Sequence, residues 1–191
     1  MRMVTILLLI NASVPASVAQ GVFTNHTNEA LQKVIGDYPN HLKNIKGDMI
    51  RQDVQTTDYV SKVEIPGAVQ CIIIQYSPAK EEIYSWKCLL FESDDFEVIQ
   101  TRYKELYDQI KNTIIKIRGQ KPFILIGSYG LPDEERKFCS SPFHLLPAMA
   151  EMQNLTVELT IQHIVTGWKI ELMVYENENK ETGLSTQARS N

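Results

Sequence analysis

The spacing of hydrophobic residues changes several times along this chain, and each change predicts a different element. Between Thr27 and Lys46 apolar residues recur every three or four positions, which predicts a first helix over about 27–46. From Val54 the spacing changes to two, and the alternation continues to residue 92 with a turn at Pro66-Gly67. Residues 54–92 are therefore predicted to form a three-stranded antiparallel meander.

The second half of the chain has stronger patterns. An apolar stripe that includes Ile114 and Ile117 follows the capping sequence Ser93-Asp94-Asp95, which predicts a long amphipathic helix from there to about Ile117. The short apolar run 122–126 predicts a buried strand. Strict alternation on both sides of Thr166-Gly167 predicts a terminal hairpin. A turn centred on these two residues pairs Ile161 with Leu172 and Leu159 with Val174.

The order of these elements indicates the fold class. Helix, three strands, helix, one or two strands and a hairpin follow one another without the alternation that parallel sheets require. We expect an α+β two-layer sandwich, with an antiparallel sheet of five to seven strands and two helices packed on one face. Residues 20–176 would form one domain, and the polar residues 177–191 a disordered tail.

The first nineteen residues resemble a secretory signal peptide. Arg2 supplies the positive start, Val4–Ile10 the apolar stretch, and Ser17-Val18-Ala19 a cleavage site of small residues. The alternative is a membrane anchor, but a spanning helix needs about 20 apolar residues, and polar residues and Pro15 interrupt this one. We expect cleavage before Gln20 and export to the periplasm or the medium, with no stable membrane insertion of the mature chain.

The charge balance argues against one class of partner. The chain has 19 basic and 23 acidic residues, a net charge of −4. Loss of Arg2 with the signal peptide leaves 18 basic residues and a net charge of −5. Because the sequence shows no basic stripe or nucleic-acid motif, we expect a protein or small-molecule ligand and no nucleic acid.

Two of the three cysteines are placed to form a disulfide. Cys71 and Cys88 lie equally far from a turn centred between Ala79 and Lys80, so the hairpin register sets them directly opposite each other. A non-hydrogen-bonded pair of this kind brings the Cα atoms to about 4.5 Å, within disulfide range. The alternative is two reduced, buried cysteines that act as small apolar residues.

Catalytic motifs are weak in this sequence. A hydrolase or thiol enzyme would need Cys139 or Ser128 as nucleophile with His144 or His163 as base. Gly127-Ser128-Tyr129-Gly130 lacks the spacing of a nucleophile elbow. The histidines lack metal-ligand spacing, so no metal or cofactor is expected.

The irregular stretch 127–153, which allows a short strand over 137–145, is the best place for binding residues, because long loops on a rigid scaffold often carry function. It offers Tyr129, Phe138, Phe143 and His144. The alternative is that Phe143 and its leucine neighbours only close one end of the sheet. The leading hypothesis is a non-enzymatic binding domain that uses this segment or a sheet face. Besides the enzyme, a structural or envelope accessory subunit that exposes an edge strand remains an alternative.

Three stretches of the chain carry a family resemblance. They are YPNHLKNIKG at 38–47, EIYSWKC at 82–88 and FHLLP at 143–147. They resemble uncharacterised exported proteins of Bacteroidetes-type bacteria, for which no activity is known. The resemblance implies a bacterial envelope or secreted setting and says nothing about mechanism.

Overall fold

A computed structural model describes residues 23–76, 83–148 and 152–177. The predicted signal peptide, the turn between the two cysteine strands and the polar tail from residue 178 lie outside the described residues. Two α-helices, two short 3-10 helices and nine strands occupy the described part of the chain. In chain order they are α1 (Phe23–Asp37), η1 (Tyr38–Asn40), β1 (Lys46–Gln52), β2 (Thr56–Ser61), β3 (Gln70–Tyr76), β4 (Ile83–Ser93), α2 (Phe96–Ile110), β5 (Ile114–Ile115), β6 (Phe123–Gly127), η2 (Glu134–Arg136), β7 (Phe138–Leu146), β8 (Leu155–Ile164) and β9 (Gly167–Glu176).

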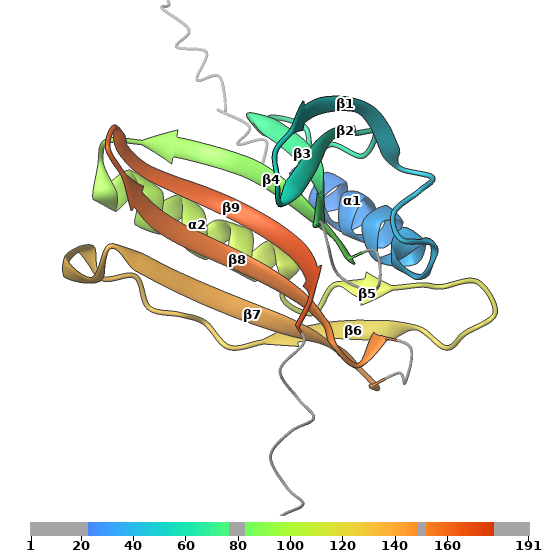
Figure 1. Ribbon diagram of the computed structural model, residues 1–191. Coiled ribbons are helices and arrows are strands. Elements are labelled where there is room, and N and C mark those ends of the chain that lie inside the picture. The colour runs from blue at the N-terminus through green and yellow to red at the C-terminus, as the bar shows by residue number, and fades with distance from the viewer. Residues whose placement is uncertain (1–22, 77–82, 149–151, 178–191) are drawn as a thin grey trace, which may run out of the picture.

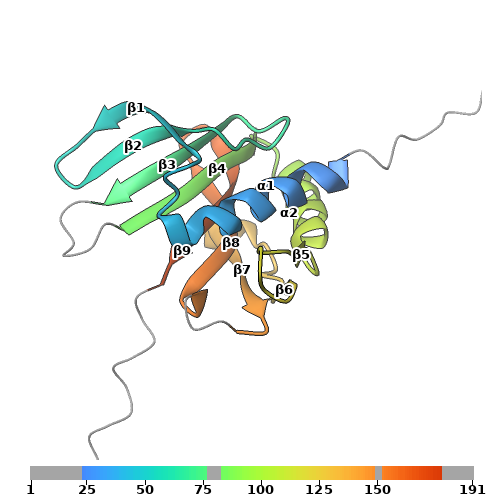
Figure 2. The same ribbon diagram turned by 90° about the vertical axis from the view of Figure 1, so that its right-hand side faces the viewer.

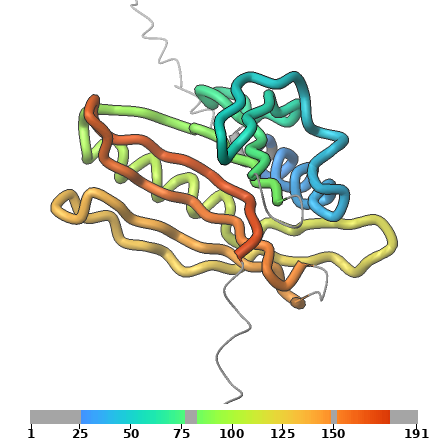
Figure 3. Tube along the Cα trace, viewed as in Figure 1, coloured from blue at the N-terminus to red at the C-terminus, as the bar shows by residue number. Residues whose placement is uncertain are grey.

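The described strands form a single antiparallel sheet in the order β1-β2-β3-β4-β9-β8-β7-β6-β5. This order divides the chain into two halves with the same plan. In each half a helix is followed by a meander: α1 precedes β1–β4, and α2 precedes β5–β9. The last strands of the two meanders, β4 and β9, pair at the junction of the halves. Figure 3 traces this path in the colours of the chain.

The predicted architecture is wrong in its strand count and in its balance of elements. Nine strands in one sheet, with two 15-residue α-helices, make the described fold mainly β rather than a sandwich of five to seven strands. Both helices lie on the same side of the sheet (Figures 1 and 2). The core between the layers is one continuous cluster, to which β4, β8 and β9 contribute fully buried residues.

The first helix ends earlier than its hydrophobic spacing predicted. α1 stops at Asp37, and η1 with Pro39 follows. His41 and Leu42 then take left-handed backbone angles, with φ of 54° and 55°. The buried Asp37 carboxylate holds this reversal, because it accepts hydrogen bonds from the backbone N–H groups of Asn44 and Ile45 at 3.0 and 3.3 Å. Residues 46–52 therefore form the strand β1, which the hydrophobic spacing did not predict.

The second helix begins where predicted and ends seven residues early. The Asp95 side chain accepts hydrogen bonds from the backbone N–H groups of Glu97 and Val98, which confirms the predicted N-terminal cap. The helix stops at Ile110, and Asn112 has a left-handed φ of 67°. Ile114 then lies in strand β5 and not on the apolar stripe of the helix.

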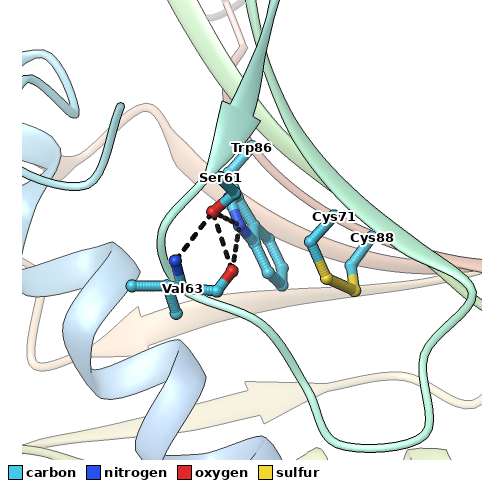
Figure 4. Close-up of a disulfide and its surroundings, with 5 residues drawn as sticks. All are labelled: Ser61, Val63, Cys71, Trp86 and Cys88. Carbon is cyan, nitrogen blue, oxygen red and sulfur yellow. Dashed lines mark hydrogen bonds between the residues drawn. A yellow bond between two sulfur atoms is a disulfide. The ribbon is translucent and has the colours of Figure 1, made fainter. Parts of the chain in front are cut away.

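The cysteine hairpin is confirmed in its register. Cys71 pairs with Cys88 across β3 and β4, their Cα atoms are 4.0 Å apart, and a disulfide joins them. Trp86 lies beside the disulfide (Figure 4). Its indole N–H donates to Ser61 Oγ at 3.0 Å, so the buried ring nitrogen is satisfied.

The terminal hairpin is confirmed, but its predicted register is wrong by two residues. Ile161 pairs with Ile170, and Leu159 pairs with Leu172. The turn is formed by Val165 and Thr166, because Gly167 already belongs to β9. A shift of two keeps every side chain on its face, since strands have a period of two. The two apolar sets therefore share the core face, as the alternation predicted.

Candidate binding face

The side of the sheet opposite the helices is polar at its centre. On β9 and β4 the Glu171 carboxylate lies 3.1 Å from Lys169 Nζ and 3.8 Å from Lys87 Nζ. The Glu171 side chain is only 12% exposed, because these neighbours cover it. The Tyr175 hydroxyl donates to a Glu158 carboxylate oxygen at 2.9 Å. Burial and this carboxylate raise the pKa of Tyr175 to about 12. The charges in this region are thus largely paired with each other.

The same face becomes apolar at the edge formed by β5, β6 and β7. The register places Ile114, Ile124 and Leu146 directly opposite one another on these three strands. Their exposed fractions are 57%, 41% and 51%. Ile126, 42% exposed, lies two residues along β6 and pairs with His144. We call Ile114, Ile124, Ile126 and Leu146 the apolar row.

The apolar row exists because β6 has only one covered face. Phe123 and Leu125 of β6 point into the core and are almost fully buried, so Ile124 and Ile126 between them face away from the helices. The strand predicted at 122–126 is present, but its predicted burial was wrong for three of the five residues. A continuous apolar run in an antiparallel sheet must expose every second side chain when helices cover one face.

The segment 127–153 is more regular than predicted. Its residues 138–146 form β7, which pairs with β6 and β8 and differs by only one residue at each end from the strand over 137–145 that the sequence allowed. Residues 149–151 lie outside the described part of the chain. The irregular backbone is thus shorter than the sequence suggested.

The four predicted binding residues do not form one site. Phe143 is fully buried in the core, which agrees with the alternative that it closes the sheet. Tyr129 is half-buried on the helix side, with its ring centroid 4.9 Å from that of Tyr107. Phe138 and His144 are both exposed on the helix-free face of β7. They lie six residues apart along the strand, and only His144 borders the apolar row.

A buried polar network lies between α2 and β7. The Tyr103 hydroxyl donates to Ser141 Oγ at 2.7 Å and also contacts the Leu159 carbonyl oxygen at 3.2 Å. The Gly130 N–H donates to the same Ser141 oxygen at 2.8 Å. Burial raises the pKa of Tyr103 well above its ordinary value, so this hydroxyl stays protonated. The network joins the helix, two strands and the segment after β6.

The described residues give the enzyme hypothesis no hydrogen-bonded pair of nucleophile and base. Cys139 pairs with core-facing Ile161, whereas His144 is an odd number of residues away on β7 and faces the opposite side. The His163 ring packs edge-on against the Trp168 ring, with 4.9 Å between the ring centroids. Within the described residues no hydrogen bond joins Cys139 or Ser128 to a histidine. Burial raises the pKa of the Cys139 thiol, which disfavours the nucleophilic thiolate.

A cavity of about 230 Å³ lies between α1 and the segment after β2. His26, Glu29 and Lys33 line it from the helix, and Lys62 and Glu64 line it from the other side. All five side chains are exposed to solvent. Because acidic and basic groups are balanced, the cavity favours no ligand charge. No sequence pattern indicated this cavity, since these segments meet only through the fold.

The described residues contain neither a metal-binding cluster nor a membrane-spanning helix. In residues 23–76, 83–148 and 152–177 there is no group of three or more histidine, cysteine or acidic side chains that could hold a metal ion. Neither described helix has the length and apolar composition that crossing a bilayer requires.

Comparison with known proteins identifies no relative of this chain. The chain matches no protein-family model, and no curated protein or solved structure shows significant similarity to it. The apolar row and its neighbourhood must therefore be interpreted from their own chemistry.

Proposed function

We propose that this chain is an exported, non-enzymatic binding domain that contacts its partner through the helix-free face of β5, β6 and β7. The observation that carries the proposal is the apolar row. Four aliphatic side chains, each at least two-fifths exposed, lie together on adjacent strands. Contiguous exposed apolar surface on a folded protein commonly marks an interaction site.

Export is supported by two independent features. The first nineteen residues have the charge, apolar stretch and small residues of a signal peptide. The Cys71–Cys88 disulfide fits an oxidising compartment, where such bonds persist. The resemblance to exported proteins of Bacteroidetes-type bacteria points to the same setting. Fractionation of expressing cells, followed by intact mass measurement, should find a chain that begins at Gln20 outside the cytoplasm.

The binding face can be tested by site-specific photo-crosslinking. A photoreactive residue at Ile124 reports on the apolar row, and one at Val165 serves as the matched control. Val165 is also aliphatic and is fully exposed, but it lies at the tip of the β8–β9 turn away from the row. In intact cells we expect crosslinked products at position 124 and none at 165. Equal crosslinking at both positions would contradict the proposal.

An assembly subunit remains the second candidate, because β1 is an exposed edge strand. Residues 48–52 of β1 are exposed, including Met49 and Ile50. Its pairing with β2 contains two register irregularities, a feature that usually protects an edge from further pairing. Light scattering on the chain from Gln20 distinguishes the two: a monomer at all concentrations counts against self-assembly through β1.

A further inference from the structure

The apolar row is bordered by a basic segment that contrasts with the acidic chain. Residues 109–132 contain Lys111, Lys116, Arg118 and Lys121 and no aspartate or glutamate. All four side chains are exposed. Within the described residues none of the four forms an ion pair with a carboxylate. A chain of net charge −4 thus carries a charge of +4 in one segment. Lys111 Nζ lies 5.8 Å from the centroid of the Tyr107 ring of α2, so Lys116, Arg118 and Lys121 are the residues that border the row.

The fold holds this basic segment next to the apolar row. Lys116 follows β5 directly and lies two residues from Ile114, and Arg118 and Lys121 belong to the connection from β5 to β6. The backbone N–H of Lys116 donates to Gln32 Oε1 at 2.6 Å, and Gln32 Nε2 donates back to the Lys116 carbonyl at 2.5 Å. Helix α1 therefore fixes the start of the connection, which projects from the body of the molecule (Figures 1 and 3).

We infer that the apolar row and its basic border form a docking surface for an anionic phospholipid membrane. This inference rests on the proposed function and names the partner of the same face. Exposed aliphatic side chains beside lysines and arginines are typical of surfaces that bind at the lipid headgroup level. Protein interfaces, by contrast, are depleted in lysine and enriched in aromatic residues. Three of the four basic residues here are lysines, and the row contains only isoleucine and leucine.

The expected binding is peripheral and sensitive to salt. A basic side chain near an anionic surface increases affinity by about fivefold. The acidic residues elsewhere on the chain repel the membrane less than the basic segment attracts it, because charges are screened beyond roughly 8–10 Å at physiological ionic strength. The aliphatic side chains add an attraction that salt does not weaken.

Vesicle sedimentation tests the inference on the chain from Gln20 with its disulfide intact. Every described element begins at or after Phe23, so this chain keeps the described fold and lacks the apolar stretch Val4–Ile10, which could bind lipid by itself. We expect sedimentation with vesicles of phosphatidylglycerol and phosphatidylcholine, little with phosphatidylcholine alone, and release by high salt. The double variant K116E/K121E should bind at least about 25-fold more weakly, at fivefold for each lost lysine.

The variant K43E/K62E is the matched control. Lys43 and Lys62 are exposed, form no ion pair within the described residues and flank β1 and β2, which lie at the opposite end of the strand order from β5. This variant has the same net charge as K116E/K121E, so it should keep nearly all of the binding. The single variant Ile124→Ser should also bind the anionic vesicles more weakly than the parent. The factor by which it weakens binding should be the same at low and at high salt. Equal losses in the two double variants, or no sedimentation with the anionic vesicles, would overturn the inference.

A protein partner would give a different result. In that case crosslinking at position 124 persists in cells, but the purified chain fails to bind protein-free anionic vesicles. This outcome overturns the lipid assignment and leaves the proposed binding face intact. If position 124 gave no crosslinked product in cells and the purified chain did not bind the vesicles, the proposed binding face itself would be rejected.

Discussion

At the scale of single residues, Gly167 shows how closely the β8–β9 turn approaches the connection from β4 to α2. Its φ is +131°, and a Cβ atom added there would lie 2.6 Å from the Ser93 carbonyl oxygen. Gly167→Ala combines backbone strain with a clash against backbone, and it should lower the free energy of unfolding by about 2–3 kcal/mol. Urea unfolding measures this change.

Gly36 supplies the comparison for that substitution. It lies in α1, and nothing is within 4 Å of a Cβ atom added there. Gly36→Ala should stabilise the protein by about 0.5–1 kcal/mol, since alanine restricts the unfolded chain and favours helix. If both alanine variants changed stability in the same direction, the described geometry at Gly167 would be contradicted.

Tyr175 predicts a pH dependence at the same scale. Its pKa is about 12 in the folded protein, whereas an unfolded tyrosine has a pKa of about 10. The folded state therefore retains this proton more strongly. The stability that the proton contributes is fully present below about pH 10 and is lost as pH rises through about 12. Tyr175→Phe should show a smaller alkaline loss of stability than the parent.

Urea unfolding between about pH 9 and pH 11 checks this difference. Both proteins should carry Cys139→Ala, because the free thiol could exchange with the disulfide at alkaline pH. Some alkaline loss should remain in the variant, since the pKa values of Tyr38 and Tyr103 are also raised by burial. Identical pH profiles for parent and variant would show that Tyr175 does not contribute.

At the scale of elements, the disulfide tests the pairing of β3 with β4. The two cysteines are 17 residues apart, and closing a loop of this length stabilises a protein by about 3 kcal/mol. The variant C71A/C88A should lose about this much stability, while Cys139→Ala should change it little. Non-reducing mass spectrometry should find one disulfide and one free thiol, and three free thiols would contradict the pairing.

Elements specified by local chemistry could be predicted from the sequence. The Asp95 cap fixed the start of α2, and the spacing of Cys71 and Cys88 from their turn gave the register of that hairpin. The terminal hairpin kept its faces despite a shift of two residues, because only the parity of the register decides burial. In each of these cases neighbouring residues contain the necessary information.

Elements that depend on distant contacts could not be predicted in the same way. Ile114 has the spacing of a helical residue, yet the helix ends at Ile110. Residues 114–115 pair with β6 and form strand β5 instead. The stretch 127–153 was predicted to be irregular apart from a short strand, yet its residues 138–146 pair with both β6 and β8. The apolar row was missed for a related reason. The run at 122–126 shows that residues are apolar, and only the one-sided packing of the sheet shows which of them are exposed.

At the scale of the whole molecule, the two halves share a single core. Trp86 and Cys88 of β4 pair with Val174 and Leu172 of β9, and all four are fully buried. The halves are also joined by side chains, since the Thr113 hydroxyl donates to Asn28 Oδ1 of α1 at 2.8 Å. Separation of the halves would expose the central strands and divide this core.

We therefore predict that neither half folds alone, although each has a helix and a meander. Chains covering 20–93 and 94–177 should each lack a cooperative unfolding transition, because each would expose one side of the β4–β9 pair as an open sheet edge. An equimolar mixture should regain the near-ultraviolet circular dichroism of the full chain, which itself should unfold in one transition by near- and far-ultraviolet signals. A half that unfolds cooperatively by itself would show that the repeated plan marks two independent domains, and the shared core would then be a contact between them.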